Sequence, residues 1–62
     1  MKLLDLLRHL AAHNCALLRE GANHSIYINR SNDQQTAVPR HREIGDNTCR
    51  AICKQLGIPF IR

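Results

Sequence analysis

Leucines recur at helical spacing over the first dozen residues of the chain. At about 100° per residue they fall within one arc, while Asp5, Arg8 and His9 point to the other side. The members of the apolar arc are Leu3, Leu6, Leu7 and Leu10. This pattern predicts an amphipathic helix over residues 2–13 that buries one face.

Three short segments in the middle of the chain have the composition of β-strands, and the second is rich in β-branched and aromatic side chains. They are residues 16–20, 25–29 and 36–38. A tight turn over residues 21–24 separates the first two, and a polar loop over residues 30–35 leads to the third, which Pro39 ends. These segments predict a three-stranded antiparallel meander.

A second amphipathic pattern lies near the C-terminus and predicts a helix over residues 47–56. Its apolar positions follow at i, i+3, i+4 and i+7, and Gly57 ends the run. The elements then come in the order α-β-β-β-α, an α+β fold with both helices packed on one face of the sheet. We expect a single domain over residues 1–62, with a thin core because of its short length.

The charge balance is basic. Nine Lys and Arg residues against five Asp and Glu residues give a net charge of +4. Arginine supplies seven of the nine cations, and its planar guanidinium suits phosphate, so nucleic acid is the favoured partner. One Tyr and one Phe are too few for the stacking platform of an RNA-recognition-motif sheet. A cofactor cleft enclosing about 300 Å³ or more is also excluded in so short a chain.

The N-terminal apolar segment does not fit an export signal or a membrane span. Asp5, Arg8 and His9 interrupt the leucines, so no apolar run reaches the length that either requires. We therefore expect the chain to be cytoplasmic, with its three cysteines reduced.

Three cysteines and four histidines raise the question of a metal site. Cys49 and Cys53 lie on the apolar side of the second predicted helix without a C-x-x-C motif, which favours buried structural thiols. His9 and His13 form an i, i+4 pair without the glutamate of an H-E-x-x-H motif, and solvated histidines are the favoured interpretation. We expect no metal and no cofactor.

A dense basic cluster follows Pro39. Arg40 and Arg42 are its arginines, and such a surface can bind nucleic-acid phosphates in a salt-dependent manner. Further candidates for RNA binding are Arg30, Arg50 and Lys54. The alternative is a solvated charged face without a ligand, and the two interpretations are nearly balanced.

His24 is the candidate for catalysis. It follows three small residues that would allow an RNA backbone to approach, and it begins a predicted strand. Imidazole can take or give a proton near neutral pH, which would help a 2′-hydroxyl attack its adjacent phosphate. Strict alternation, however, places His24 with Ile26 and Ile28 on the face expected to be covered, so a partly buried structural histidine is the competing interpretation.

Three motifs occur along the chain in a recognisable order. Small residues precede His24 before the second strand, a V-P-x-H motif spans residues 38–41, and an R-x-I-x-K-Q-x-G-I motif spans residues 50–58. Together they resemble the HicA (YcfA-like) toxins over nearly the whole chain from Leu3 to Ile58. The resemblance implies a small fold like that of double-stranded-RNA-binding domains, an mRNA interferase activity and a HicB antitoxin partner.

The same resemblance places the catalytic histidine of the family on His24. It implies the toxin of a type II toxin–antitoxin system, a metal-independent endoribonuclease that cleaves mRNA and is neutralised by a HicB-type antitoxin. The alternative is a non-catalytic module of the double-stranded-RNA-binding type. A third possibility is a purely structural or protein-interaction module, which would neither bind nor cleave RNA.

Overall fold

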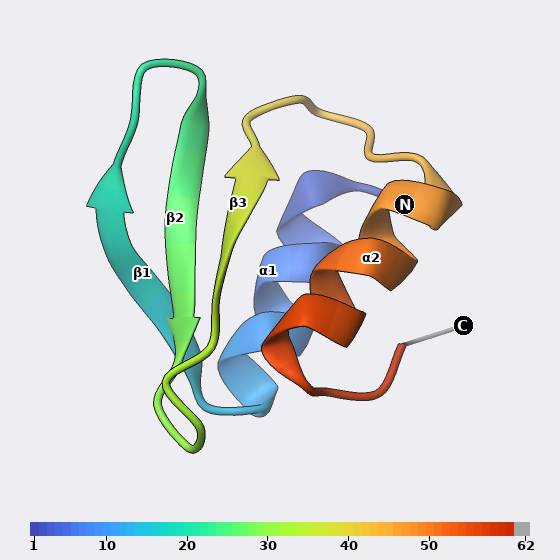
Figure 1. The fold of residues 1–62 in the computed structure, drawn as a ribbon. Helices are drawn as coiled ribbons and strands as arrows, with labels where there is room; N and C mark the ends of the chain where they lie inside the picture. The colour runs from blue at the N-terminus through green and yellow to red at the C-terminus, as the bar shows by residue number, and fades with distance from the viewer. Residues whose placement is uncertain (61–62) are drawn as a thin grey trace.

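The computed structural model describes residues 1–60, and its elements follow the predicted order. They are α1 (Leu3–Ala12), β1 (Cys15–Glu20), β2 (His24–Asn29), β3 (Gln35–Pro39) and α2 (Asp46–Leu56) (Figure 1). Every boundary lies within one residue of its prediction from the sequence. The α+β fold with a three-stranded antiparallel sheet is therefore confirmed.

The fold has two layers, with the sheet on one side and both helices on the other (Figure 1). The strand order is β1-β2-β3, so β2 is central and pairs antiparallel with both neighbours. The β1–β2 register shifts between Leu17 and Arg19, which makes a bulge near the end of β1. Beyond the bulge, Glu20 pairs with Ser25.

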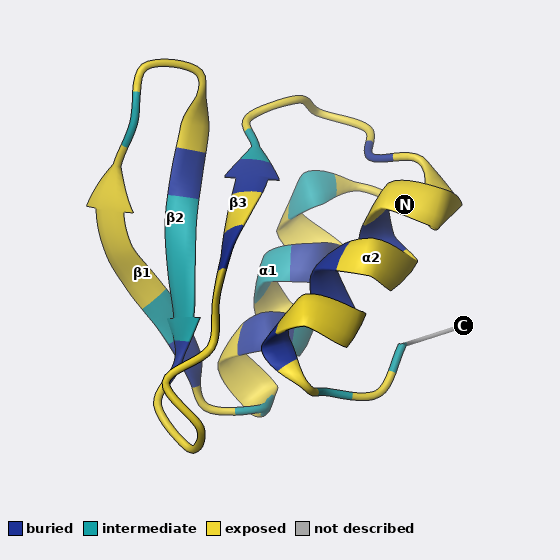
Figure 2. Ribbon diagram, viewed as in Figure 1, coloured by how far each residue is buried: buried dark blue, intermediate teal, exposed yellow. Residues whose placement is uncertain are grey.

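The core lies between the two layers, where the buried parts of both helices and of β3 are found (Figure 2). Leu6 and Leu10 of α1 meet Val38 of β3 and the buried side of α2 there. The residues buried on α2 are Cys49, Ile52, Cys53 and Leu56. The i, i+3, i+4, i+7 pattern read from the sequence is thus the core face of this helix.

The prediction about the face of β2 was wrong. Ser25 and Asn29 are buried beneath the helices, so His24, Ile26 and Ile28, which alternate with them, lie on the face of the sheet that the helices leave open. The physical reason is that polar side chains on the covered face find partners there. The Asn29 amide donates to the Leu56 carbonyl at the end of α2 at 2.7 Å. His24 is exposed, which excludes the buried structural histidine as its interpretation.

All three cysteines are buried and free, which confirms the prediction for Cys49 and Cys53 and adds Cys15 to the core. Burial raises the pKa of the Cys53 thiol, and the neighbouring Cys49 and Cys15 raise it further. A raised pKa keeps the thiol protonated at neutral pH and therefore poorly reactive. Within residues 1–60, no three His, Cys, Asp or Glu side chains are grouped so that they could hold a metal ion.

The prediction that His9 and His13 are solvated was also wrong, since both are half-buried. Their rings meet edge to face, with centroids 4.6 Å apart. The His9 Nε2 is hydrogen-bonded to the Pro59 carbonyl, because the segment after α2 folds back over α1. Local sequence patterns could not predict this contact, because the two residues are 50 positions apart in the sequence. Over the described part of the chain, no helix has the length and apolar character to cross a membrane.

Candidate functional site

His24 is the first residue of β2 and pairs with Pro39, the last residue of β3. The preceding turn is closed by the Gly21 N–H, which donates to the His24 carbonyl at 2.7 Å. A Cβ atom at Gly21 would lie only 3.0 Å from that carbonyl oxygen, so any larger residue would push the turn apart by a few tenths of an ångström. The backbone of an exposed histidine is therefore held at the end of the sheet, as the sequence analysis expected of a strand start.

Arg40 follows Pro39 directly and contacts the same turn. Its Nη1 donates to Glu20 Oε1 at 2.7 Å, and its Nη2 donates to the Gly21 carbonyl at 2.9 Å and to the Ala22 carbonyl at 2.5 Å. The sequence pattern predicts that this guanidinium binds RNA phosphate, and it gives no sign of these contacts within the protein. They join the end of β3 to the segment that leads into His24.

Glu20 and Ser25 are site residues that the sequence analysis missed. The Ser25 hydroxyl donates to Glu20 Oε1 at 2.8 Å, and that oxygen also accepts the hydrogen bond from Arg40. Glu20 and Ser25 flank the turn and are cross-strand partners. The predicted turn over residues 21–24 makes residues 20 and 25 the closing pair of the hairpin, so this pair could have been found from the sequence; the bulge shifts the register only further from the turn, between Leu17 and Arg19.

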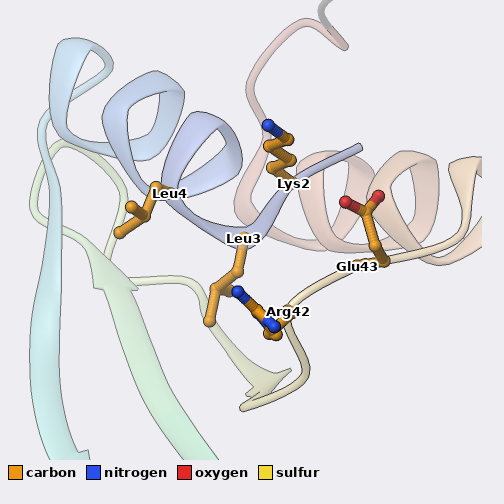
Figure 3. A pocket seen from close by; sticks show the side chains of 5 residues that line it. All are labelled: Lys2, Leu3, Leu4, Arg42 and Glu43. Atoms are coloured by element: carbon orange, nitrogen blue, oxygen red, sulfur yellow. The ribbon is translucent and has the colours of Figure 1, made fainter.

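Arg42 lies against the start of α1, where its backbone carbonyl accepts a hydrogen bond from the Leu3 N–H at 2.9 Å. Beside it is a surface pocket of about 500 Å³. Figure 3 shows its lining residues, which are Lys2, Leu3, Leu4, Arg42 and Glu43. The pocket is only partly enclosed by these side chains. Within residues 1–60 Arg42 forms no ion pair, so its charge is available to a ligand.

The structure brings Arg40 and Arg42 to the His24 end of the sheet. Arg42 is three residues beyond Pro39, so its Cα lies within about 11 Å of the Pro39 Cα. His41 is exposed in the same segment. The basic cluster and the candidate catalytic histidine therefore belong to one end of the molecule.

The other candidate cations are more dispersed. Arg30 follows β2, and the length of that strand separates it from His24 by about 20 Å. Arg50 and Lys54 are on the exposed side of α2, where the Arg50 guanidinium lies 4.6 Å from the centroid of the Phe60 ring. RNA that contacts all of these residues would have to run along much of the domain.

This arrangement combines one accessible imidazole with a firmly held backbone and nearby guanidinium groups. Such a site can transfer a proton and can hold a phosphate.

One known protein family matches the chain. A family model described as the HicA toxin of bacterial toxin–antitoxin systems matches residues 5–58, which include the turn before His24, the basic cluster and the whole of α2. Neither the curated proteins nor the solved structures contain a match to the chain. Since the family match spans the sheet, most of α1 and the candidate site, this chain belongs to the HicA toxin family.

Proposed function

We propose that this HicA-family toxin is a metal-independent endoribonuclease that cleaves mRNA, with His24 as its catalytic residue. The observation that best supports this function is the exposed imidazole of His24, which lies at the end of the sheet from which the chain leads to Arg42. RNA is the substrate because it brings its own nucleophile, the 2′-hydroxyl, so one positioned side chain is enough to assist the reaction.

In the proposed reaction the 2′-oxygen attacks the adjacent phosphorus and forms a new P–O bond. The bond from phosphorus to the 5′-oxygen of the next nucleotide breaks. His24 accepts the proton of the 2′-hydroxyl, and solvent supplies the proton of the departing 5′-oxygen. The products are a 2′,3′-cyclic phosphate and a 5′-hydroxyl. Arg42 holds the phosphate during the attack, and Arg30, Arg50 and Lys54 extend the contact along the RNA.

The experiment that tests this function is cleavage of a single-stranded RNA in the presence of EDTA. We expect fragments with 2′,3′-cyclic phosphate and 5′-hydroxyl ends, and we expect no cleavage where a 2′-deoxynucleotide replaces the nucleotide that supplies the nucleophile. RNA binding without cleavage would instead support the non-catalytic module of the double-stranded-RNA-binding type. Neither binding nor cleavage would support a structural or protein-interaction module.

RNA binding is expected to weaken by an order of magnitude or more when salt rises from about 50 to about 200 mM, because phosphate contacts release counterions. Arg42→Ala should lower the slope of log K against log salt by roughly 0.7 to 1, the loss of one such contact. Filter binding or fluorescence anisotropy at four salt concentrations measures the slope. Arg8→Ala is the matched control, because Arg8 is exposed on α1 and is already paired with Asp5. A slope that Arg42→Ala leaves unchanged would place the phosphate contacts elsewhere.

Membership of a toxin–antitoxin family implies an antitoxin partner. We propose that this partner is a HicB-type antitoxin with an acidic surface that covers His24 and the basic cluster together, since complementary charge favours association. Such an interface would silence the nuclease by denying RNA access to both.

Binding of that antitoxin should also stabilise the toxin. At about 100 times the dissociation constant it adds about 2.7 kcal/mol to the free energy of unfolding, which is roughly 10–20 °C in Tm for a domain of this size. One titration, followed by both thermal melts and RNA cleavage, measures the two effects. Stabilisation with full activity retained would show that the antitoxin binds away from His24.

A further inference from the structure

The three hydrogen bonds of the Arg40 guanidinium all go to one short stretch, residues 20–22. That stretch leads directly into His24, and its two carbonyls belong to residues of the turn. The turn is otherwise closed by the hydrogen bond from the Gly21 N–H to the His24 carbonyl. Without Arg40, the Gly21 and Ala22 carbonyls would have no partner in the described part of the chain. The arginine therefore restrains the backbone on the N-terminal side of His24.

Glu20 extends the same restraint to the C-terminal side of His24. Its Oε1 accepts from Arg40 Nη1 and from the hydroxyl of Ser25, the residue that follows His24. Ser25 is buried and pairs in the sheet with Val38, a core residue, so the sheet fixes its position. The chain of contacts from Arg40 through Glu20 to Ser25 thus spans His24 and connects the turn to the rigid part of the sheet.

The shape of the guanidinium matters as much as its charge. Arg40 uses two different nitrogens, one on the carboxylate and one on the two carbonyls. A planar fork can make both sets of contacts at once, whereas the ammonium of lysine is a single point charge on a flexible stem. The Arg40 side chain is 39% exposed and its partner Glu20 is 58% exposed, so RNA could still approach them. The carboxylate, however, offsets the positive charge that Arg40 would present to a phosphate.

We propose that Arg40 is a positioning residue for His24 and not a phosphate contact, an inference that rests on the proposed nuclease function. With Glu20 and Ser25 it holds the turn so that the imidazole meets the 2′-hydroxyl in the reactive orientation. Arg42, which lies two residues further along and has no ion pair within residues 1–60, serves the phosphate instead.

The test separates kcat from KM for RNA cleavage. Arg40→Ala should lower kcat by about 10- to 100-fold, because a displacement of about 1 Å in a reacting group costs up to about 10² in rate. The KM should change by less than about threefold, since a positioning residue does not bind substrate. Arg40→Lys should fail to restore kcat, because it keeps the charge but loses the fork. Arg8→Ala, which removes an arginine of equal charge from α1, should change neither constant.

A double-mutant cycle then tests the chain of contacts. Glu20→Ala should lower kcat as Arg40→Ala does, and the double variant should be little worse than either, because the two residues act as one unit. Restoration of kcat by Arg40→Lys would overturn the inference. A rise in KM with a lower salt slope and an unchanged kcat, the behaviour expected of Arg42→Ala, would overturn it as well.

Amide hydrogen exchange supplies a measurement that does not depend on cleavage. In Arg40→Ala and Arg40→Lys the Gly21 N–H should exchange at least about tenfold faster, because the turn opens more often, while the amides of α2 keep their protection. Unchanged exchange at Gly21 would overturn the positioning role. Absence of RNA cleavage by the unmodified protein would overturn the proposed nuclease function, a result distinct from any of those for Arg40. Should Arg40→Ala lose protection in α2 as well, Arg40→Lys and Glu20→Gln provide the same comparison with milder changes.

Discussion

Replacement of His24 by alanine is expected to lower the rate of RNA cleavage by a factor of about 10²–10⁴, the usual contribution of one positioned proton-transfer group. The fold should persist, because the imidazole is exposed on the open face of the sheet and is not part of the core. RNA binding should persist too, since the guanidinium groups are unchanged. Single-turnover cleavage, RNA binding and a thermal melt of the same protein measure the three properties.

His41→Ala is the matched control, because His41 is also an exposed histidine and lies in the adjacent basic cluster. We expect it to cleave RNA at nearly the original rate. If His24→Ala cleaves normally and His41→Ala does not, the chemistry belongs to His41. If His24→Ala melts many degrees lower and no longer binds RNA, the role of His24 is structural after all.

The elements of this fold could be predicted from the sequence because their signals are local. Leucine spacing defines α1, the i, i+3, i+4, i+7 pattern defines α2, and turn residues separate the strands, so every boundary lies within one residue of its prediction. The orientation of β2 could not be predicted in this way. Alternation identifies two faces but not which one is covered, and here the covered positions are the polar Ser25 and Asn29.

In the candidate site, too, local features could be predicted and contacts between distant residues could not. The place of His24 at the start of a strand could be predicted from local features, but its exposure could not, because alternation grouped it with Ile26 and Ile28 on the face expected to be covered. The partners of Arg40 could not be predicted either, because Glu20 lies 20 residues earlier and reaches it only through sheet pairing. An arginine in a basic cluster suggests a phosphate ligand, and only the three-dimensional structure shows that one of two neighbouring arginines already has a carboxylate partner. The same reasoning explains why the contact of His9 with Pro59 was not foreseen.

Leu10→Ala is expected to lower the free energy of unfolding by about 2–5 kcal/mol, the range for a leucine truncated inside a core. Leu10 is on the core side of α1 and is completely buried, with 0% of its surface exposed. A domain of this length has a total stability of only about 3–9 kcal/mol. The loss is therefore expected to leave a large unfolded fraction at physiological temperature, which urea or thermal unfolding followed by circular dichroism would detect.

Leu4→Ala makes the same chemical change on the same helix at a site that is 66% exposed. It should alter the free energy of unfolding by less than about 0.5 kcal/mol, as surface substitutions usually do. Both variants share the gain in helix propensity from leucine to alanine, so the difference between them isolates burial. Equal losses for the two variants would mean that α1 does not pack on the sheet through Leu10. The helix would then have to pack on the sheet through its other side, which carries Leu4 and borders the pocket beside Arg42.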